Sequence, residues 1–277
     1  MSTSIVCGID GSGGAWRAVS VAAALARALD VRAVMLHVME DGHTSAFGSP
    51  RRTVRARGTR RRVEAIVEEY CFQADTGLHV RAGDPARELL LVAAQENAEL
   101  LVVASGRQGP GGAALVGGVA SALMRKSPCP VVVVPRDVAP PAEARIKSSV
   151  VCAVENEETD VYVLRLATDL ARRLGGSLQV VIGCAEAEVA PQTPPGDAPL
   201  SVAREEAGVI VVGPPGQRAP GSIDGCDLAL RVVAEACAPV VVLPPHATLD
   251  PGSGHYELEQ LGHRRGLGPR RRPDAAE

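Results

Sequence analysis

The chain has 277 residues, enough for roughly two domains of about 100 to 150 residues each. Apolar residues make up 46% of the sequence but aromatic residues only 2%, so the core must consist mainly of Val, Ala and Leu. This composition suits parallel strands covered by helices better than it suits a β-sandwich. With 29 basic against 32 acidic side chains, the net charge excludes a global electrostatic attraction to nucleic acid or membranes.

The first half contains short apolar runs that we predict as five strands, each bounded by Gly, Asp or Pro. They lie at residues 4–9, 31–38, 77–81, 100–104 and 131–134, the third being the weakest. Runs of this length that alternate with helical patterns are typical of buried parallel strands in β–α units. The expected order is therefore a strand followed by a helix, repeated up to a fifth strand.

Helical periodicity occupies the intervals between these strands. The predicted helices cover residues 13–29, 59–72, a segment from 85 onward, and 116–126. The third helix is expected to begin at Asp84-Pro85. Aspartate can accept hydrogen bonds from the free N–H groups of a first helical turn, and proline fits the first helical position.

The second half repeats the first in a shortened form. Residues 6–10 have a counterpart at an offset of 145, whereas 102–104 and 130–134 have counterparts at an offset of only 109. The second copy has therefore lost 36 residues, the difference between the two offsets. Gly196-Asp197, the counterpart of Gly83-Asp84, places most of this loss at the second helix and the third strand. The second copy is expected to have four strands.

These patterns give the expected domain organisation. The first domain covers residues 1–137, a Pro-containing linker 138–146, and the truncated second domain 147–245. Residues 246–277 are rich in Gly, Pro and Arg and lack apolar periodicity, so we predict a disordered tail.

Cysteine usage and the N-terminus bear on the cellular compartment. Seven cysteines, an odd number with no C-x-x-C or Cys/His spacing, support neither a disulfide framework nor a metal site. The N-terminus lacks the features of a signal peptide, and no apolar run is long enough to span a membrane. We expect a cytoplasmic protein.

Four motifs in the first half carry a resemblance to a known family. They are Gly8-Ile9-Asp10-Gly11-Ser12, Leu36-His37-Val38, Gly83-Asp84-Pro85, and a Gly-rich loop followed by Cys129-Pro130 and the valines up to Pro135. In this order and spacing the chain resembles the universal stress protein (UspA-like) family over about residues 1–137 and, more weakly, 147–245.

The resemblance implies an α/β fold with two Rossmann-like (adenine nucleotide alpha hydrolase-like) open parallel sheets, helices on both faces, and strand order 3-2-1-4-5 in the first. Ligands bind such sheets in the crevice outside the carboxyl ends of strands one and four, where the winding reverses. Nucleotide-binding members of the family hold ATP there. The strand-one Asp lies near the adenosine, the backbone of the strand-two Val near the base, and a G-x2-G-x9-G-[ST] loop around the phosphates.

The Gly-rich loop of this chain departs from the family pattern. Without gaps, the four motif positions fall on Ala104, Arg107 and the pair Gly117-Gly118, so two glycines and the hydroxyl are absent. A shifted alignment, beginning at Gly106-x2-Gly109, restores two glycines in a loop that is two residues shorter. Arg107 could contact a phosphate in place of a backbone N–H. The resemblance assigns to the nucleotide site Ile9, Asp10, Val38, Ala104, Gly106, Arg107, Gly109, Gly117, Gly118 and Val119.

The second copy keeps only the first half of the loop pattern, Gly213-x2-Gly216. The second half falls on Cys226-Asp227, whose carboxylate would repel a triphosphate, and Glu155 replaces the strand-one Asp. We expect no nucleotide in this copy. A cation site formed by Glu155, Glu157 and Asp197 is the alternative to solvated carboxylates, which are favoured.

The leading hypothesis is a cytosolic stress-response or regulatory protein whose first domain binds ATP, ADP or AMP, with Mg²⁺. No loop residue resembles a general base, so we predict no catalytic residue and at most slow ATP hydrolysis. The alternative is a non-binding interaction module in which the two copies pack as an internal pseudo-dimer, with homodimer formation left open. Seven arginines between residues 51 and 62 lack interleaved aromatics, which favours a solvated flexible segment over a nucleic-acid site.

Overall fold

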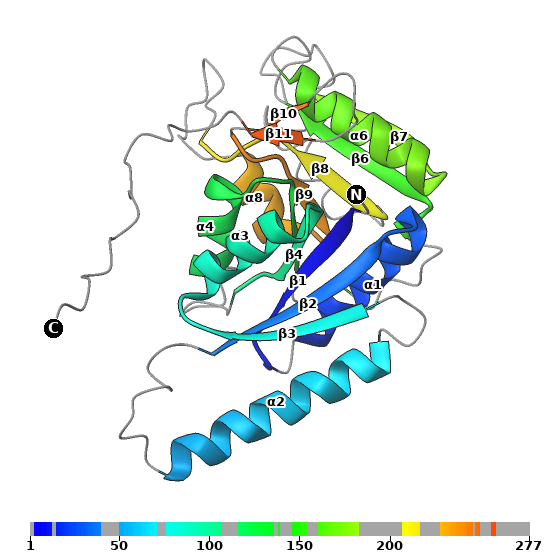
Figure 1. The fold of residues 1–277 in the computed structure, drawn as a ribbon. Coiled ribbons are helices and arrows are strands. Elements are labelled where there is room, and N and C mark those ends of the chain that lie inside the picture. Colours follow the sequence, from blue (N-terminus) through cyan, green and yellow to red (C-terminus); the bar gives the residue numbers. More distant parts are fainter. Residues whose placement is uncertain are drawn as a thin grey trace, which may run out of the picture.

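The computed structural model describes residues 3–12, 15–39, 50–70, 76–106, 116–135, 138, 146–154, 160–182, 207–216, 228–245, 247–249 and 256–258. Its first half alternates strands and helices in the predicted order (Figure 1). The elements are β1 (Ser4–Ile9), α1 (Ala15–Leu29), β2 (Arg32–Met39), α2 (Pro50–Tyr70), β3 (Thr76–Ala82), α3 (Pro85–Gln95), β4 (Ala98–Ala104), α4 (Gly118–Lys126) and β5 (Val131–Val134). All five strands pair in parallel in the order β3-β2-β1-β4-β5, which confirms the predicted topology.

The start of α3 shows how local sequence sets an element boundary. Asp84 is the N-cap, and its Oδ1 accepts a hydrogen bond of 2.8 Å from the backbone N–H of Arg87. Pro85 occupies the first turn, where its missing N–H leaves no helical hydrogen bond unmade. The helix therefore begins where the sequence predicts.

The second half contains the predicted four strands among its described residues. They are β6 (Ser149–Val154), β7 (Ser177–Ile182), β8 (Val209–Val212) and β9 (Val240–Val242), with helices α6 (Val161–Leu174) and α8 (Leu228–Glu235). The strands are parallel in the order β9-β8-β6-β7. This order repeats β5-β4-β1-β2 of the first half and stops where β3 would follow.

The two predicted sheets are joined into one sheet of nine strands. Strand β5 pairs with β9 in antiparallel fashion, and Val132 lies opposite Val241. Both side chains are fully buried. The junction between the two halves is therefore part of the hydrophobic core rather than a surface contact.

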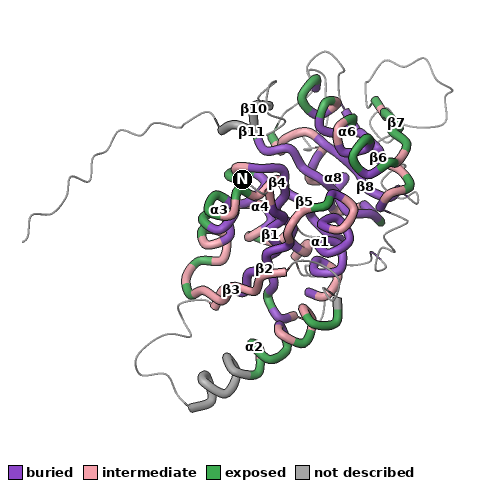
Figure 2. The backbone as a smooth tube through the Cα atoms, turned by 45° about the vertical axis from the view of Figure 1, so that its right-hand side comes forward, coloured by how far each residue is buried: buried purple, intermediate pink, exposed green. Residues whose placement is uncertain are grey.

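Helices cover both faces of this sheet, and the two faces form separate hydrophobic clusters (Figure 2). One cluster holds α1, α6 and the buried Val63 of α2, while the other holds α3, α4 and α8. Helix α1 is rich in alanine, and most of its side chains are buried. Small side chains let α1 lie close to the strands and to α6, which it contacts across the β5–β9 junction.

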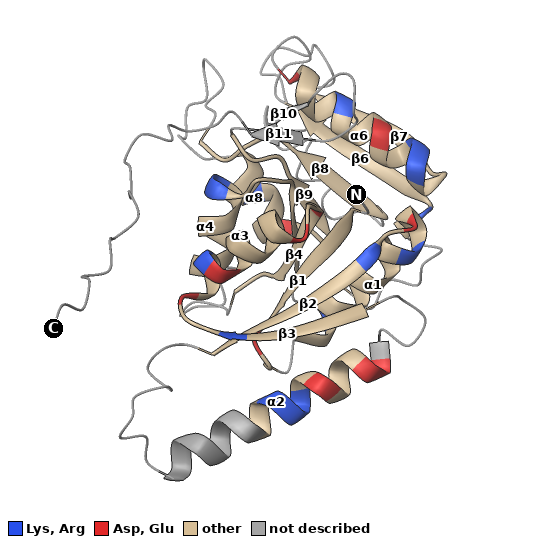
Figure 3. Ribbon diagram, viewed as in Figure 1, with Lys and Arg blue, Asp and Glu red and all other residues tan. Residues whose placement is uncertain are grey.

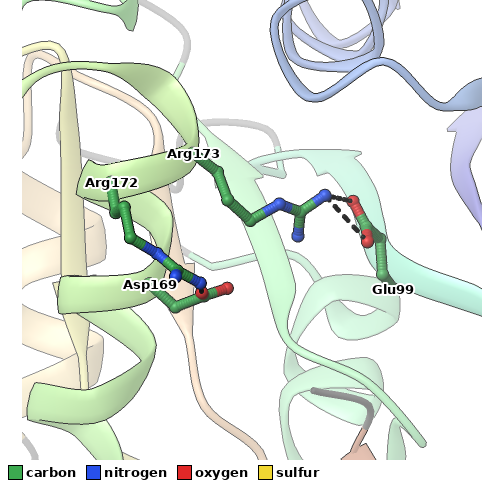
Figure 4. Close-up of polar contacts among 4 residues, drawn as sticks. All are labelled: Glu99, Asp169, Arg172 and Arg173. Carbon is green, nitrogen blue, oxygen red and sulfur yellow. Dashed lines mark hydrogen bonds and ion pairs between the residues drawn. The ribbon is translucent and has the colours of Figure 1, made fainter. Parts of the chain in front are cut away.

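An ion pair also links the two halves (Figure 4). One guanidinium nitrogen of Arg173, on α6, donates to both carboxylate oxygens of Glu99, on β4, at 2.9 and 3.1 Å. Neighbouring Arg172 instead pairs within its own helix, with Asp169. The pair between the halves is only partly exposed, so it is less screened by solvent than a surface ion pair.

Helix α2 differs from its prediction. It begins at Pro50 rather than near residue 59, so the arginine-rich stretch is helical rather than a loop. Arginine is a good helix former, and Arg60 pairs with Glu64 one turn later at 2.8 Å. Glycine is unfavourable inside a helix, yet α2 continues through Gly58. The buried side chain of Val63 holds the following turns against the core.

The structure describes only parts of the predicted linker and tail. Val138 and Ile146, the two ends of the linker that the structure describes, are buried in the core. Within the tail, β10 (Ala247–Leu249) and β11 (Tyr256–Leu258) form an antiparallel pair. The other residues of 246–277 lie outside the described part of the chain, so the predicted disorder of the tail stays a prediction.

Substitution of two glycines by alanine is expected to change the free energy of unfolding in opposite directions. A Cβ on Gly176 would lie 2.5 Å from the carbonyl oxygen of Lys147, whereas a Cβ on Gly58 would meet nothing within 4 Å. We expect Gly176→Ala to lower the free energy of unfolding by about 2 kcal/mol. Gly58→Ala should raise it by roughly 0.5–1 kcal/mol, because alanine is favoured inside a helix. Urea unfolding followed by circular dichroism measures both, and a neutral Gly176→Ala would show that this backbone contact is not tight.

The buried thiols predict a pH dependence of stability. Burial raises the pKa of the Cys129 thiol to about 12, with the Ser127 hydrogen bond lowering it and the Glu99 carboxylate raising it by smaller amounts. Burial, with a smaller contribution from Asp160, likewise raises the pKa of Cys152 to about 12. The folded chain thus keeps protons that the unfolded chain releases above the ordinary pKa of 9.0, so stability falls as pH rises from 9.0 towards about 12.

Urea midpoints at pH 8 and pH 10.5 test this expectation, both values being chosen from the ordinary range of thiol titration. The double variant Cys129→Ala, Cys152→Ala should lose less stability over this interval than the unsubstituted protein. An equal loss in both proteins would assign the alkaline instability to other groups.

Candidate functional site

The reversal of winding occurs between β1 and β4, which are adjacent and parallel. The chain leaves β1 into α1 on one face of the sheet and leaves β4 towards α4 on the other. The segments that follow the two strands therefore diverge and leave a crevice at the carboxyl edge. Ile9 and Ala104, the last residues of these strands, border it.

Asp10 follows β1 directly and is exposed at this edge. Its Oδ1 accepts a hydrogen bond of 2.9 Å from the backbone N–H of Ser12. Gly11 between them has a φ of +68°, a conformation that favours glycine. The Asp10 side chain thus shapes the turn into α1 and still presents a carboxylate to the crevice.

His37 positions the end of β1 from the neighbouring strand, a role that sequence reasoning missed. Its side chain is buried, and Nδ1 donates to the carbonyl oxygen of Ile9 at 2.8 Å. A carbonyl only accepts, so this nitrogen carries a proton. Val38 follows His37 on β2 and is partly buried against the hydrophobic cluster that contains α3. The carbonyl of the next residue, Met39, accepts a hydrogen bond from the N–H of Gly83.

The two ends of the Gly-rich loop meet at the crevice. A Cβ on Gly117 would lie 2.9 Å from Cα of Gly106 and 3.2 Å from its backbone nitrogen, so the two backbones are in direct contact. The N–H of Ser105 is held by the carbonyl of Val134 at 2.8 Å, which fixes the first end of the loop to β5. Arg107 and Gly109 lie outside the described residues.

Helix α4 points its N-terminus at the same place. Gly117 is its N-cap, and no side chain caps the first turn. A Cβ on Gly118 would meet nothing within 4 Å, while Val119 is partly buried against the core. An uncapped first turn offers backbone N–H groups and the positive end of the helix dipole to an anion.

Helix α2 closes one side of the crevice. Its residues were not among the predicted residues of the site. A Cβ on Gly11 would lie 2.6 Å from the Thr59 methyl group, and Arg62 donates to the carbonyl of Gly11 at 3.3 Å. Thr59 and Arg62 lie three residues apart, on one side of a helix. Both residues fall within the predicted helix 59–72, but their contact with Gly11 was not predicted, because it joins segments about 50 residues apart.

The second half is described only in part at the equivalent place. Gly213 and Gly216 follow β8, and Gly216 has a φ of +91°. Five residues of the predicted second site lie outside the described residues: Glu155, Glu157, Asp197, Cys226 and Asp227. The predicted loss of nucleotide binding in this copy therefore stays a prediction.

Among the side chains that the structure describes, no three His, Cys, Asp or Glu residues gather as a metal-binding group. No described helix has the length and apolar character needed to cross a membrane.

Comparisons with known proteins agree with this architecture. Residues 1–135 match the model of the Universal stress protein family. No curated protein matches the chain significantly.

Solved structures match over most of the chain. A universal stress protein from Archaeoglobus fulgidus DSM 4304 is 18% identical with a TM-score of 0.57, and the match covers 88% of this chain and 99% of that one. A Pseudomonas aeruginosa UCBPP-PA14 protein provisionally described as a universal stress protein is 15% identical with the same TM-score, over 88% of this chain and 93% of that one. At these identities the likeness shows a shared fold. The family match by itself assigns residues 1–135 to the universal stress protein family.

Proposed function

We propose that the protein is a stress-response regulator that binds an adenine nucleotide, such as ATP, at the crevice between β1 and β4. In this proposal residues 1–137 form the nucleotide-binding domain, and residues 147–245 form its degenerate partner. The output would be a change in conformation or in partner binding rather than rapid turnover.

The contact between Gly106 and Gly117 is the observation that carries the proposal. Backbone atoms approach each other there more closely than any side chain would allow, directly before the uncapped N-terminus of α4. A phosphate requires close approach to N–H groups free of Cβ atoms, and a helix N-terminus adds a partial positive charge. The residues at this point therefore fit an anion such as a polyphosphate.

The other two parts of the nucleotide have candidate partners nearby. The exposed carboxylate of Asp10 could accept hydrogen bonds from ribose hydroxyls, since carboxylates are acceptors. The backbone at Val38 lies at the carboxyl end of β2, next to β1, where an adenine ring could contact it. Magnesium would be held mainly by phosphate oxygens and water, as Mg²⁺ usually is at nucleotide sites.

A second candidate function has its own support. The β5–β9 junction packs the two halves edge to edge through fully buried valines. A protein whose halves form such a pseudo-dimer could serve as an interaction module without binding any nucleotide. Nucleotide titration separates the two functions.

Substitutions at Gly117 and Asp10 test the binding site. Gly117→Val would force a side chain into the Gly106 backbone, so we expect ATP binding to weaken at least about tenfold. Asp10→Ala should also weaken it about tenfold, through loss of a charged acceptor. Asp10→Asn keeps the hydrogen bond to Ser12 and removes only the charge. It therefore separates a direct role of the carboxylate from its role in the turn.

Calorimetric titration with ATP and AMP, with and without Mg²⁺ and at two temperatures, provides the measurement. Glu155→Ala, in the second half, is the matched control and should bind as the unsubstituted protein does. Thermal unfolding of each variant checks that the fold is intact. Absence of heat and of thermal stabilisation at millimolar nucleotide would reject nucleotide binding in favour of the interaction module.

A further inference from the structure

Strand β7 is the last strand at one edge of the nine-stranded sheet. No other strand among the described residues pairs with its outer side, because the order ends at β7. The sequence of β7, Ser-Leu-Gln-Val-Val-Ile, contains no charged residue. The strand therefore carries neither the blue nor the red of charged residues in Figure 3. Edge strands of soluble proteins usually carry charges, prolines or bulges that prevent pairing with another chain.

The opposite edge of the sheet is protected in the usual way. Strand β3 carries Arg81, which pairs with Glu88 and hydrogen-bonds to Gln95 at 2.7 Å. It also carries His79, whose ring lies 3.9 Å from the carboxylate of Glu96. Only one of the two sheet edges therefore lacks charge.

An apolar stripe on β7 is exposed as well. Leu178, Val180 and Ile182 share one face of the strand and are 37%, 38% and 41% exposed. Their counterparts on β2, by pairing register and the offset of 145, are Ala33, Met35 and His37, all of which are buried. In the first half α2 contacts β2 and β3 pairs with it, whereas no described element of the second half corresponds to α2 or β3.

The neighbouring helix α6 has polar side chains at two positions that are buried in α1, whereas the stripe on β7 is apolar. Ser20 and Ala23 of α1 are buried, but their counterparts in α6, Arg165 and Thr168, are polar and exposed. A surface that remains in water is expected to become polar in this way. The stripe on β7 has instead kept three large apolar side chains, which indicates that it is covered in the assembled protein.

We propose that β7 pairs with β7 of a second copy of this chain, which would join two nine-stranded sheets into one. The proposal concerns an assembly surface and does not depend on nucleotide binding. The β5–β9 junction is a precedent within the molecule, since two copies of the same fold already join there by uncharged antiparallel edge strands. That junction occupies the free edge of β5, so β7 is the remaining uncharged edge.

A two-fold axis perpendicular to the sheet defines the register. Antiparallel partners lie on the same face, so a register centred on Val180 places each Leu178 opposite Ile182 of the other copy. The two apolar stripes then lie side by side, and the unpaired backbone groups of both edges form hydrogen bonds. Leu178, Val180 and Ile182 pair with β6 residues of the cluster that contains α6, so the stripe lies on the α6 face of the sheet.

Sedimentation equilibrium of the full chain tests the proposal. We expect a dimer, and we expect Val180→Lys to raise its dissociation constant more than about 100-fold because two lysines would face each other at the centre of the interface. Thr76→Lys, on the protected edge strand β3, is the matched control and should leave the dimer intact. Circular dichroism and thermal unfolding establish that each variant is folded.

Hydrogen exchange provides a second measurement that needs no variant. Amides of residues 177–182 should exchange faster at low protein concentration than at high concentration. A monomer at all concentrations, or a dimer that Val180→Lys leaves intact, would overturn the proposal. Protection of β7 that does not change with concentration would also overturn it and would show that the chain covers its own edge.

Discussion

The antiparallel pairing of β5 with β9 is the interaction on which the rest of the molecule depends. It joins the five-stranded first half and the four-stranded second half into one continuous sheet, and it buries both strands between helices from each half. Helices α1 and α6 meet across it, and the Arg173–Glu99 pair links the halves a second time. A second half with four strands would be a small domain with little core of its own. Joined at β5, it shares the core of the first half.

The crevice between β1 and β4 is placed by the same sheet but built by local sequence. Glycine at position 11 and the Asp10 side chain turn the chain out of β1, and His37 holds that strand end from β2. Contact between Gly106 and Gly117 brings β4 and α4 together without side chains between them. The site therefore consists mostly of backbone, which suits a ligand recognised through its phosphates.

The family resemblance implied the strand order, which the structure confirms. The positions of the strands, the start of α3 and the shortened second copy were predicted from apolar periodicity, capping and repeat offsets. Sequence reasoning did not predict the length of α2 or the contacts of Thr59 and Arg62 with Gly11. Those features depend on packing between segments about 50 residues apart, which no local pattern records. The buried linker ends, Val138 and Ile146, were missed for the same reason: single apolar residues in a stretch of polar, Ala and Pro residues show no periodicity.

The β5–β9 junction also has a consequence for biosynthesis. The residues that it pairs, such as Val131 and Val242, are far apart in the chain, so β5 emerges from the ribosome long before its partner exists. During that interval four consecutive valines form an open, uncharged strand edge on an otherwise complete first half. Such an edge favours pairing between neighbouring nascent chains. The order of synthesis therefore makes the first half aggregation-prone until the last strand of the second half protects it.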